Sequence, residues 1–199
     1  MREFEITTRV TEPLESVETK LKTLGFRKVK TATIDDIYMC PKDLSVTKDN
    51  IQYVLSKSAL IRHIYGDFYG KQEEYKLLTY KDKRLEKGVV ISEEKISVNV
   101  DSVETTLKLL LAMGYDELVR VCNNYVVYEK EGFELALQSV KDLGLLIEYE
   151  SESDCDNMST EEILAIKKDM LKEVKALGIK TTDEYDVKKA YELIQKKLG

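Results

Sequence analysis

The sequence predicts an α+β protein: an antiparallel eight-stranded β-barrel or tunnel with flanking helices and a C-terminal helical extension. Three observations favour this fold. Segments in which polar and apolar residues alternate recur along the first 150 residues, as in strands with one buried face. A strand, a capped helix and a glycine followed by an aromatic residue occur twice, around Gly25 and Gly114. Two further helical patterns lie beyond residue 150.

The first strand, residues 2–10, shows the alternation most clearly. Its polar face carries Glu3, Glu5, Thr7 and Arg9. A half-buried strand with its polar face in water is the usual interpretation. Paired carboxylates recur, however, at Glu148 and Glu150 in the last strand, and strands between them carry Lys or Arg at alternate positions. This distribution predicts the lining of a polar cavity.

A helix is expected after the first strand. Thr11 can cap it, Pro13 suits its first turn, and Gly25 can end it. Further strands are predicted at residues 26–31, 34–40, 58–65, 73–81 and 89–100. Residues 41–50 and 81–87 are polar or charged and predict loops.

The second half repeats this order of elements. Asp101 and Glu104 form a capping-box-like start to an apolar helix face that ends at Gly114. Strands at residues 118–128, 133–137 and 145–150 then complete about eight. A closed sheet built from both halves would leave no exposed edge.

The last quarter of the chain has a different pattern. Residues 151–158 are acidic and polar and predict a hinge, after which Ser159 and Thr181 can each open a helix. We therefore expect a tunnel domain over 1–150, with 151–199 as a hinge and C-terminal helical extension of the same domain. A helix pair of this size cannot bury a core alone, so it should pack on the tunnel or on a partner, such as a second copy in a homodimer.

Composition excludes several classes of protein. The chain has 199 residues, 43% of them hydrophobic, and a net charge of −6, which argues against bulk attraction to nucleic acid or to an anionic membrane. The sequence begins with a charged strand and contains no run of the roughly 18 apolar residues that a membrane span needs, so we predict a cytoplasmic protein. Cys40, Cys122 and Cys155 are widely spaced and His63 is the single histidine, which supports neither a disulfide framework nor a zinc site.

Short motifs occur in a recognisable order along nearly the whole chain. Residues 3–7 read Glu-Phe-Glu-Ile-Thr, 36–39 Asp-Ile-Tyr-Met, 78–81 Leu-Thr-Tyr-Lys, and 143–150 Leu-Gly-Leu-Leu-Ile-Glu-Tyr-Glu. In this order they resemble the motifs of the CYTH superfamily, which includes class IV adenylyl cyclases and thiamine triphosphatases. Its members are also called triphosphate tunnel metalloenzymes.

The resemblance implies an enzyme that acts on a triphosphate inside a β-tunnel with Mg²⁺ or Mn²⁺. It would be a class IV adenylate cyclase, making cyclic AMP and pyrophosphate from ATP, or a hydrolase of tripolyphosphate or thiamine triphosphate. Such metals prefer oxygen ligands, whereas Arg and Lys suit phosphate oxygens. By this resemblance the metal ligands would be Glu3, Glu5, Glu148 and Glu150. The phosphate-binding residues would be Arg9, Arg62, Lys81 and Arg120.

Several positions depart from the family's pattern. Uncharged residues stand where the family has a lysine, two glutamates and an aspartate: Thr7, Ser97, Asn99 and Gln138. One alternative is therefore a catalytically weakened relative that binds a nucleotide or polyphosphate without turnover. Another is an interaction scaffold whose tunnel binds no ligand. For the four glutamates themselves, the ordinary interpretation is a solvated sheet face. The sequence assigns no catalytic residue.

Overall fold

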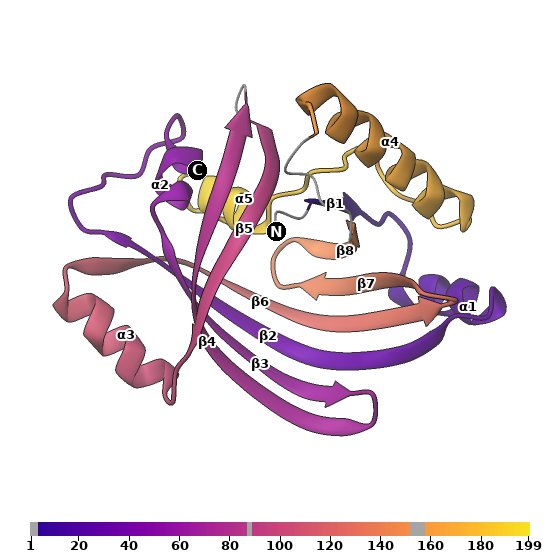
Figure 1. Cartoon of the computed structure of the whole chain (residues 1–199), viewed down its shortest axis with the longest axis horizontal. Coiled ribbons are helices and arrows are strands. Elements are labelled where there is room, and N and C mark those ends of the chain that lie inside the picture. The colour runs from indigo at the N-terminus through magenta and orange to yellow at the C-terminus, as the bar shows by residue number, and fades with distance from the viewer. Residues whose placement is uncertain (1–3, 87–88, 152–157) are drawn as a thin grey trace.

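The chain folds around a single sheet of eight antiparallel strands, with helices on its outer face and at its ends (Figure 1). The structure, a computed structural model, describes residues 4–86, 89–151 and 158–199. The strands are β1 (Phe4–Arg9), β2 (Arg27–Pro41), β3 (Ala59–Phe68), β4 (Lys71–Glu86), β5 (Val89–Asn99), β6 (Tyr115–Lys130), β7 (Phe133–Val140) and β8 (Gly144–Ser151). The helices are α1 (Leu14–Thr23), α2 (Ile51–Ser56), α3 (Val103–Ala112), α4 (Thr160–Ala176) and α5 (Lys189–Lys197).

The sheet is curled into a tunnel-like shape but does not close. Its order is β1-β8-β7-β6-β2-β3-β4-β5, so β1 and β5 are its edges. Figure 1 shows β4 and β5 crossing the other strands steeply, as the curl requires. The predicted antiparallel eight-stranded tunnel is therefore confirmed, whereas the full closure we expected is not found.

The C-terminal segment covers the β1 edge in place of a strand. Thr7 accepts a backbone hydrogen bond from Val187 and donates one to Tyr185, at 3.0 and 3.1 Å. Thr182 donates to Arg9 O at 2.9 Å. Residues 180–187 thus satisfy edge groups of β1 that would otherwise remain unpaired.

Two strands are longer than the sequence suggested. The predicted strands at 26–31 and 34–40 form one strand, β2, because it lies inside the sheet and pairs with β3 on one side and β6 on the other. Residues 81–86, predicted as a loop, continue β4 because they pair with β5. Helix α2 lies between the predicted loop at residues 41–50 and the predicted strand at 58–65, where the apolar pattern indicates neither a helix nor a strand clearly.

The helix starts agree with the sequence in part. Ser159 and Glu162 form the predicted capping box of α4. Ser102, one residue after the predicted Asp101, caps α3 by accepting a hydrogen bond from Thr105 N. The helix expected from Thr181 starts only at Lys189, because the residues before it pair with β1.

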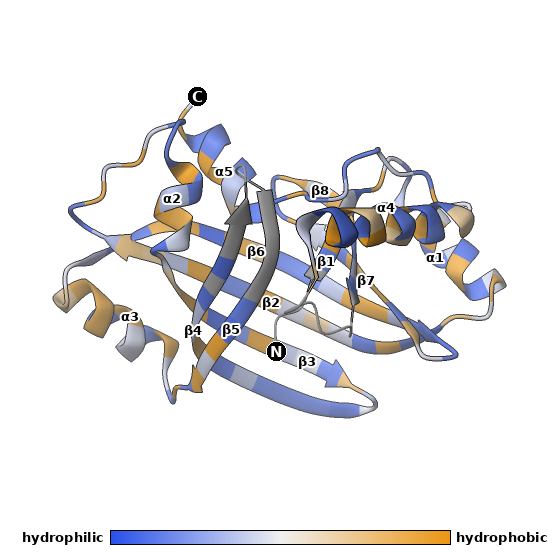
Figure 2. Cartoon of the chain, turned by 45° about the horizontal axis from the view of Figure 1, so that its top comes forward, coloured by the Kyte–Doolittle hydropathy of each residue, from blue (hydrophilic) through white to orange (hydrophobic). Residues whose placement is uncertain are grey.

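Both C-terminal helices pack into the cores of the tunnel domain. Met170 and Val174 of α4 share one core with Ile6 of β1 and Leu137 of β7. Ala190 and Ile194 of α5 share another with Val121 of β6 and Leu146 of β8. A third core lies under α3, against β2 and β3. Figure 2 shows the alternation of polar and apolar residues along the strands that makes these cores possible.

Candidate functional site

The interior face of the curled sheet carries charged residues from strands that are distant in sequence. Cross-strand partners project from the same face of a sheet. Four register pairs set this face: Glu5 with Glu150, Thr7 with Glu148, Asp36 with Arg62, and Lys81 with Lys95. Alternation places the remaining interior residues, so the period of two that the sequence shows is the reason these groups converge.

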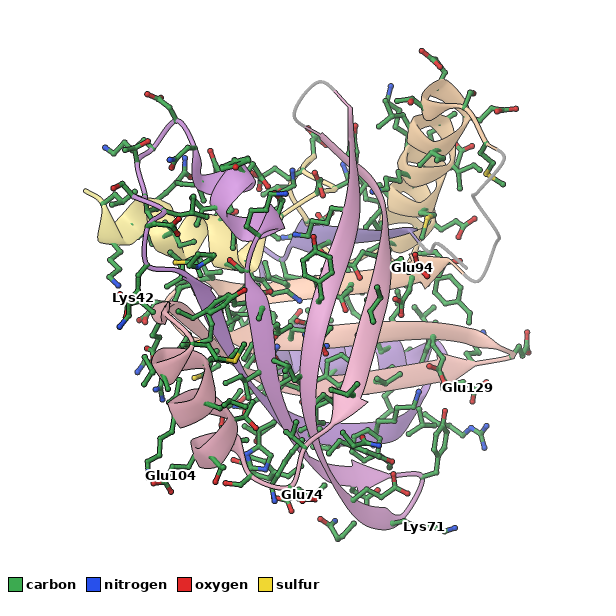
Figure 3. The ribbon with its side chains drawn as sticks, turned by 60° about the vertical axis from the view of Figure 1, so that its left-hand side comes forward. Lys42, Lys71, Glu74, Glu94, Glu104 and Glu129 are labelled. Carbon is green, nitrogen blue, oxygen red and sulfur yellow. The ribbon has the colours of Figure 1, made fainter. Side chains whose placement is uncertain are left out.

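The first residue of α5 adds a further cation to this interior. We call the set Glu5, Lys81, Lys95, Gln138, Glu148, Glu150 and Lys189 the tunnel cluster. Other charged groups lie at the periphery, and Figure 3 shows Lys71, Glu74 and Glu104 pointing away from the sheet. The tunnel cluster is thus distinct from the ordinary charged surface.

Glu148 on β8 is an enclosed acid of the tunnel cluster, with its side chain 17% exposed. Lys189 Nζ donates to Glu148 Oε2 at 2.7 Å and to Gln138 Oε1 at 2.8 Å. Burial by itself raises the pKa of Glu148, but the charge and hydrogen bond of Lys189, with the charge of Lys81, lower it to about 2. Burial lowers the pKa of Lys189, yet Glu148 and Glu5 raise it overall. Both groups are therefore ionised at neutral pH.

Lys95 and Glu150 form an ion pair across the open side of the sheet. Lys95 on β5 donates to Glu150 Oε1 on β8 at 2.9 Å. Burial lowers the pKa of Lys95, but the charges of Glu5 and Glu150 raise it overall. Because β5 is one edge and β8 lies next to the other, this pair connects the two sides that backbone hydrogen bonds do not join.

Arg62 and Asp36 form a fork-like pair beside the tunnel cluster. Arg62 Nε and Nη2 donate to the two carboxylate oxygens of Asp36, each at 2.7 Å, and the Asp36 side chain is only 7% exposed. Burial lowers the pKa of Arg62, but Asp36, and to a smaller extent Glu148, raise it well above its ordinary value. This geometry fixes the guanidinium and turns it toward the interior charges.

Two of the predicted phosphate-binding arginines lie away from the tunnel cluster. Arg9 is on the same face as Glu5, but its guanidinium contacts Glu192 of α5 at 2.7 Å and the carbonyl oxygen of Leu143 at 2.9 Å. Arg120 pairs in register with Ile37, the neighbour of Asp36, and so projects from the opposite face of the sheet.

The outward placement of Arg120 agrees with its contacts. Its guanidinium donates to Glu117 Oε2 at 2.6 Å, and its side chain is 53% exposed. The structure therefore brings together Glu5, Arg62, Lys81, Glu148 and Glu150 of the predicted set. The remaining predicted metal ligand, Glu3, lies outside the described residues.

The uncharged departures from the family's motifs also face the interior. Thr7 and Gln138 are almost fully buried, and Ser97 Oγ lies 2.9 Å from Thr79 Oγ1. Asn123 donates to Gln138 at 3.3 Å, while its buried Oδ1 has no hydrogen-bond partner among the described residues.

The carboxylates do not form a ready-made metal site. Within the described ranges, no group of three or more His, Cys, Asp and Glu side chains is arranged to hold a metal ion. The ammonium groups of Lys189 and Lys95 bind the oxygens of Glu148 and Glu150 that a cation would use. A metal would therefore have to displace these lysines or recruit further oxygen ligands.

Lys189 is the member of the tunnel cluster that the sequence did not predict. It lies 41 positions from Glu148, and no local motif relates α5 to β8. The available signal was indirect: Thr7 stands where the family has a lysine, and Lys188 and Lys189 precede the last amphipathic segment.

Comparisons with known proteins agree with the fold. No protein-family model matches the chain. A protein of Methanocaldococcus jannaschii named "Putative adenylate cyclase" is 27% identical over 181 residues, which cover 90% of this chain and 91% of that protein.

Two solved structures extend over nearly all of the chain. The PH1819 protein from Pyrococcus horikoshii OT3 is similar with a TM-score of 0.69 and 20% identity, covering 98% of this chain and 99% of that one. A "putative adenylate cyclase" from Vibrio parahaemolyticus has a TM-score of 0.66 and 13% identity, covering 98% of both chains. The chain therefore shares the fold of these two structures over nearly its whole length.

Proposed function

We propose that the protein is a CYTH-type enzyme that binds a triphosphate in the tunnel cluster and acts on it. Its reaction would be that of a class IV adenylate cyclase, or hydrolysis of tripolyphosphate or thiamine triphosphate. The observation that carries the proposal is the convergence of four basic side chains on one interior: Arg62, Lys81, Lys95 and Lys189. The names of the relatives from M. jannaschii and V. parahaemolyticus support this class of reaction.

The lysines of the tunnel cluster can exchange their carboxylate partners for the phosphate oxygens of a bound polyanion. A triphosphate carries several negative charges, and lysine ammonium groups bind phosphate oxygens as point charges. Each lysine donates up to three hydrogen bonds, so Lys95 and Lys189 can turn toward phosphate while their acids become available. Arg62, held by Asp36, would present its remaining N–H groups without reorganising.

Dependence on Mg²⁺ or Mn²⁺ stays a prediction. Glu5, Glu148 and Glu150 supply the oxygen chemistry that these ions prefer. Glu148 and Glu150 are paired with lysines, so the three acids do not form a metal site as arranged, and we derive no step of the reaction through a metal.

Binding without turnover is a second candidate, and a specific observation favours it. The interior positions Thr7, Ser97 and Gln138 are uncharged, and internal lysines already neutralise Glu148 and Glu150. A tunnel of this kind would still attract a polyphosphate but would lack charges that stabilise a transition state. Such a protein should bind tripolyphosphate in the absence of divalent cations.

Product analysis by liquid chromatography separates these functions. The wild type is incubated with ATP, tripolyphosphate or thiamine triphosphate, in Mg²⁺, Mn²⁺ or EDTA, beside Glu148→Gln and an exposed control, Glu104→Gln. Cyclic AMP and pyrophosphate, lost in Glu148→Gln but not in Glu104→Gln, would establish a cyclase. Orthophosphate with the same dependence would establish a triphosphatase.

The remaining outcomes are equally decisive when thermal shifts are recorded in parallel. A ligand raises the melting temperature only if it binds the folded state. Stabilisation by a polyphosphate without any product would establish the binding function. If neither a product nor a rise in melting temperature is seen, the proposal is overturned in favour of an interaction scaffold.

Location and assembly are separate matters. Within the part of the chain that the structure describes, no helix is long and apolar enough to cross a bilayer. A cytoplasmic location and a homodimer both stay predictions, and sedimentation velocity would test the second.

A further inference from the structure

The last residues of β5 form an exposed apolar edge of the sheet. β5 stands at one end of the strand order, and its residues Ile96 and Val98 are 56% and 57% exposed. Both lie on the outer face, because they alternate with Lys95, whose side chain faces the interior. Tyr80, the register partner of Ile96 on β4, is also exposed there. We call Tyr80, Ile96 and Val98 the β5 patch.

This edge lacks the features that usually protect an edge strand. Natural sheets protect an edge with a charge, a proline or a covering segment. The other edge, β1, is covered by residues 180–187. Residues 96–99 of β5 read Ile-Ser-Val-Asn and contain neither a charge nor a proline. The end of β5 is therefore suited to strand pairing.

The backbone of this edge is arranged to accept a further strand. The N–H group of Val100 donates to the carbonyl oxygen of Lys76 at 2.9 Å, in the register of the β4–β5 pair. Hydrogen-bonded positions alternate along an antiparallel pair, so the even-numbered residues just before Val100 bond to β4 in the same way. Ser97 and Asn99 consequently direct their N–H and C=O groups toward the open side.

The edge is complementary to a second copy of itself. If two β5 strands pair antiparallel about a two-fold axis at Ser97, Ile96 of each copy lies opposite Val98 of the partner subunit. Such cross-strand pairs of β-branched residues stabilise a sheet, and a two-fold axis forms each pair twice. In the same register Lys95 lies opposite Asn99 of the partner subunit, so no two like charges meet in these pairs.

The neighbouring registers fit less well. An axis at Lys95 would place two like charges opposite each other. An axis at Ile96 would place Glu94 opposite Val98. An axis at Val98 would pair Ile96 with residue 100, beyond the end of β5. The order of residues along this edge thus favours the first register.

We propose that the protein forms a two-fold dimer in which the β5 strands of two copies pair antiparallel about Ser97 and join the two sheets. The C-terminal helices, which pack within their own chain, are not the interface. Because cross-strand partners share a face, Asn99 of the partner subunit lies beside Lys95 on the interior side. It adds a polar group to the open side of the tunnel. The dimer does not depend on the proposed reaction.

Sedimentation velocity tests the interface. The wild type, Val98→Lys and the control Leu109→Lys are compared over a series of protein concentrations. Leu109 has the same 57% exposure but lies on α3. Two lysines enter each dimer of Val98→Lys, and lysine protects natural edge strands, so we expect the dissociation constant to rise about 10-fold or more. Leu109→Lys should dimerise like the wild type, and circular dichroism checks that both variants fold.

Disulfide formation tests the register. In a hydrogen-bonded antiparallel pair the two Cα atoms are about 5.5 Å apart, a distance that a disulfide spans. Oxidation of Ser97→Cys should therefore give a covalent dimer, whereas Thr105→Cys, exposed on α3, should not. The wild type is the control for crosslinks through the three native cysteines.

Each result decides one point. A wild type that stays monomeric at every concentration overturns the dimer. A dimer that Val98→Lys and Leu109→Lys leave equally strong, without a Ser97→Cys crosslink, overturns β5 as its interface. A dimer that Val98→Lys weakens but Ser97→Cys does not crosslink overturns the axis at Ser97. Weakening by Val98→Lys together with the crosslink supports the proposal, and the product analysis described above tests the proposed function separately.

Discussion

The Asp36–Arg62 pair illustrates how the cost of losing a charge depends on burial. Arg62→Ala would leave the Asp36 carboxylate, 7% exposed, without its partner. Removing one member of a buried pair costs about 3–5 kcal/mol, so we expect the free energy of unfolding of Arg62→Ala to fall by about that amount. Urea denaturation followed by circular dichroism measures the change.

Arg120 provides the matched control for this prediction. Its guanidinium also makes a bidentate contact with a carboxylate, that of Glu117, but the Arg120 side chain is 53% exposed. Exposed pairs contribute about 0–1 kcal/mol, so Arg120→Ala should change little. Equal losses in both variants would contradict the distinction between an interior and an exterior arginine.

The face on which an interior side chain lies could be predicted where the alternation along a strand determines it. It could not be predicted where packing between distant elements determines it. Alternation correctly places Glu148, Glu150 and Arg62 on one face, because side chains in a strand alternate without exception between regular residues. Arg120 is different, because it alternates with Val121, the register partner of Asp36, and so faces outward beside Ile37. This placement depends on the pairing of β6 with β2, which the sequence does not specify. Lys189 could not be placed at all, since α5 reaches β8 only through tertiary contacts.

At the scale of elements, Glu12 connects α1 to the turn after α4. Its carboxylate accepts hydrogen bonds from Lys20 Nζ at 2.7 Å and from the backbone N–H of Lys180 at 2.9 Å. These bonds, that of Lys20 first, lower the pKa of Glu12 from its ordinary 4.5 to about 2. An acid with a lowered pKa stabilises the folded state above its unfolded pKa, and this contribution is lost as the pH falls toward the folded value.

Glu12→Gln should therefore be less stable than the wild type at pH 7, with a difference that shrinks progressively below pH 4.5. The urea midpoints of the two proteins, measured between pH 7 and pH 3, check this. Glu15→Gln, on the first turn of the same helix, serves as control. A difference that is constant over this pH range would show that the Glu12 carboxylate is not the stabilising group.

Gly66 permits the close contact of β3 with β2. A Cβ atom at this position would collide with the carbonyl oxygen of Thr31 and lie 2.5 Å from Ala32 Cα. Because the obstacle is backbone, the strands would have to separate, and overpacking of this kind costs about 1–3 kcal/mol. Gly66→Ala should lower the urea midpoint accordingly, whereas Gln72→Ala, at an exposed position of β4, should not. A stable Gly66→Ala protein would show that the β2–β3 pairing can relax.

Element boundaries were less predictable than element types. The capping box of α4 is local, and the sequence located it correctly. Residues 180–187 also begin with a capping-like pattern, yet they pair with β1 because its edge groups need hydrogen-bond partners. Likewise the charged residues 81–86 form a strand because β5 is available to pair with them.

At the scale of the whole molecule, the internal repeat explains the shape of the sheet. Each half contributes a strand, a helix and a glycine at positive φ, Gly25 and Gly114, before a long strand, β2 or β6. These two long strands pair with each other at the centre of the sheet, and the other strands extend on both sides. The two halves therefore surround one interior, which is left open between β5 and β1 and spanned there by Lys95 and Glu150.

The C-terminal residues complete this molecule rather than forming an appendage. They pair with the β1 edge, supply Lys189 to the interior, and bury apolar side chains from α4 and α5 in two cores. A chain ending at residue 151 would expose these surfaces of β1, β6 and β8 to water. Because native domains are stable by only about 5–15 kcal/mol, we expect residues 1–151 alone to lose cooperative unfolding.

Circular dichroism and urea denaturation of this truncated chain, beside the full-length variant Ile194→Ala, separate the loss of one contact from the loss of the whole segment. Ile194 is 2% exposed, and truncating such a side chain costs about 2–5 kcal/mol. Ile194→Ala should therefore remain cooperative with a lower midpoint, while the truncated chain shows no sharp transition. A cooperative transition for residues 1–151 would mean that the eight strands fold independently, and that α5 delivers Lys189 to a tunnel that already exists.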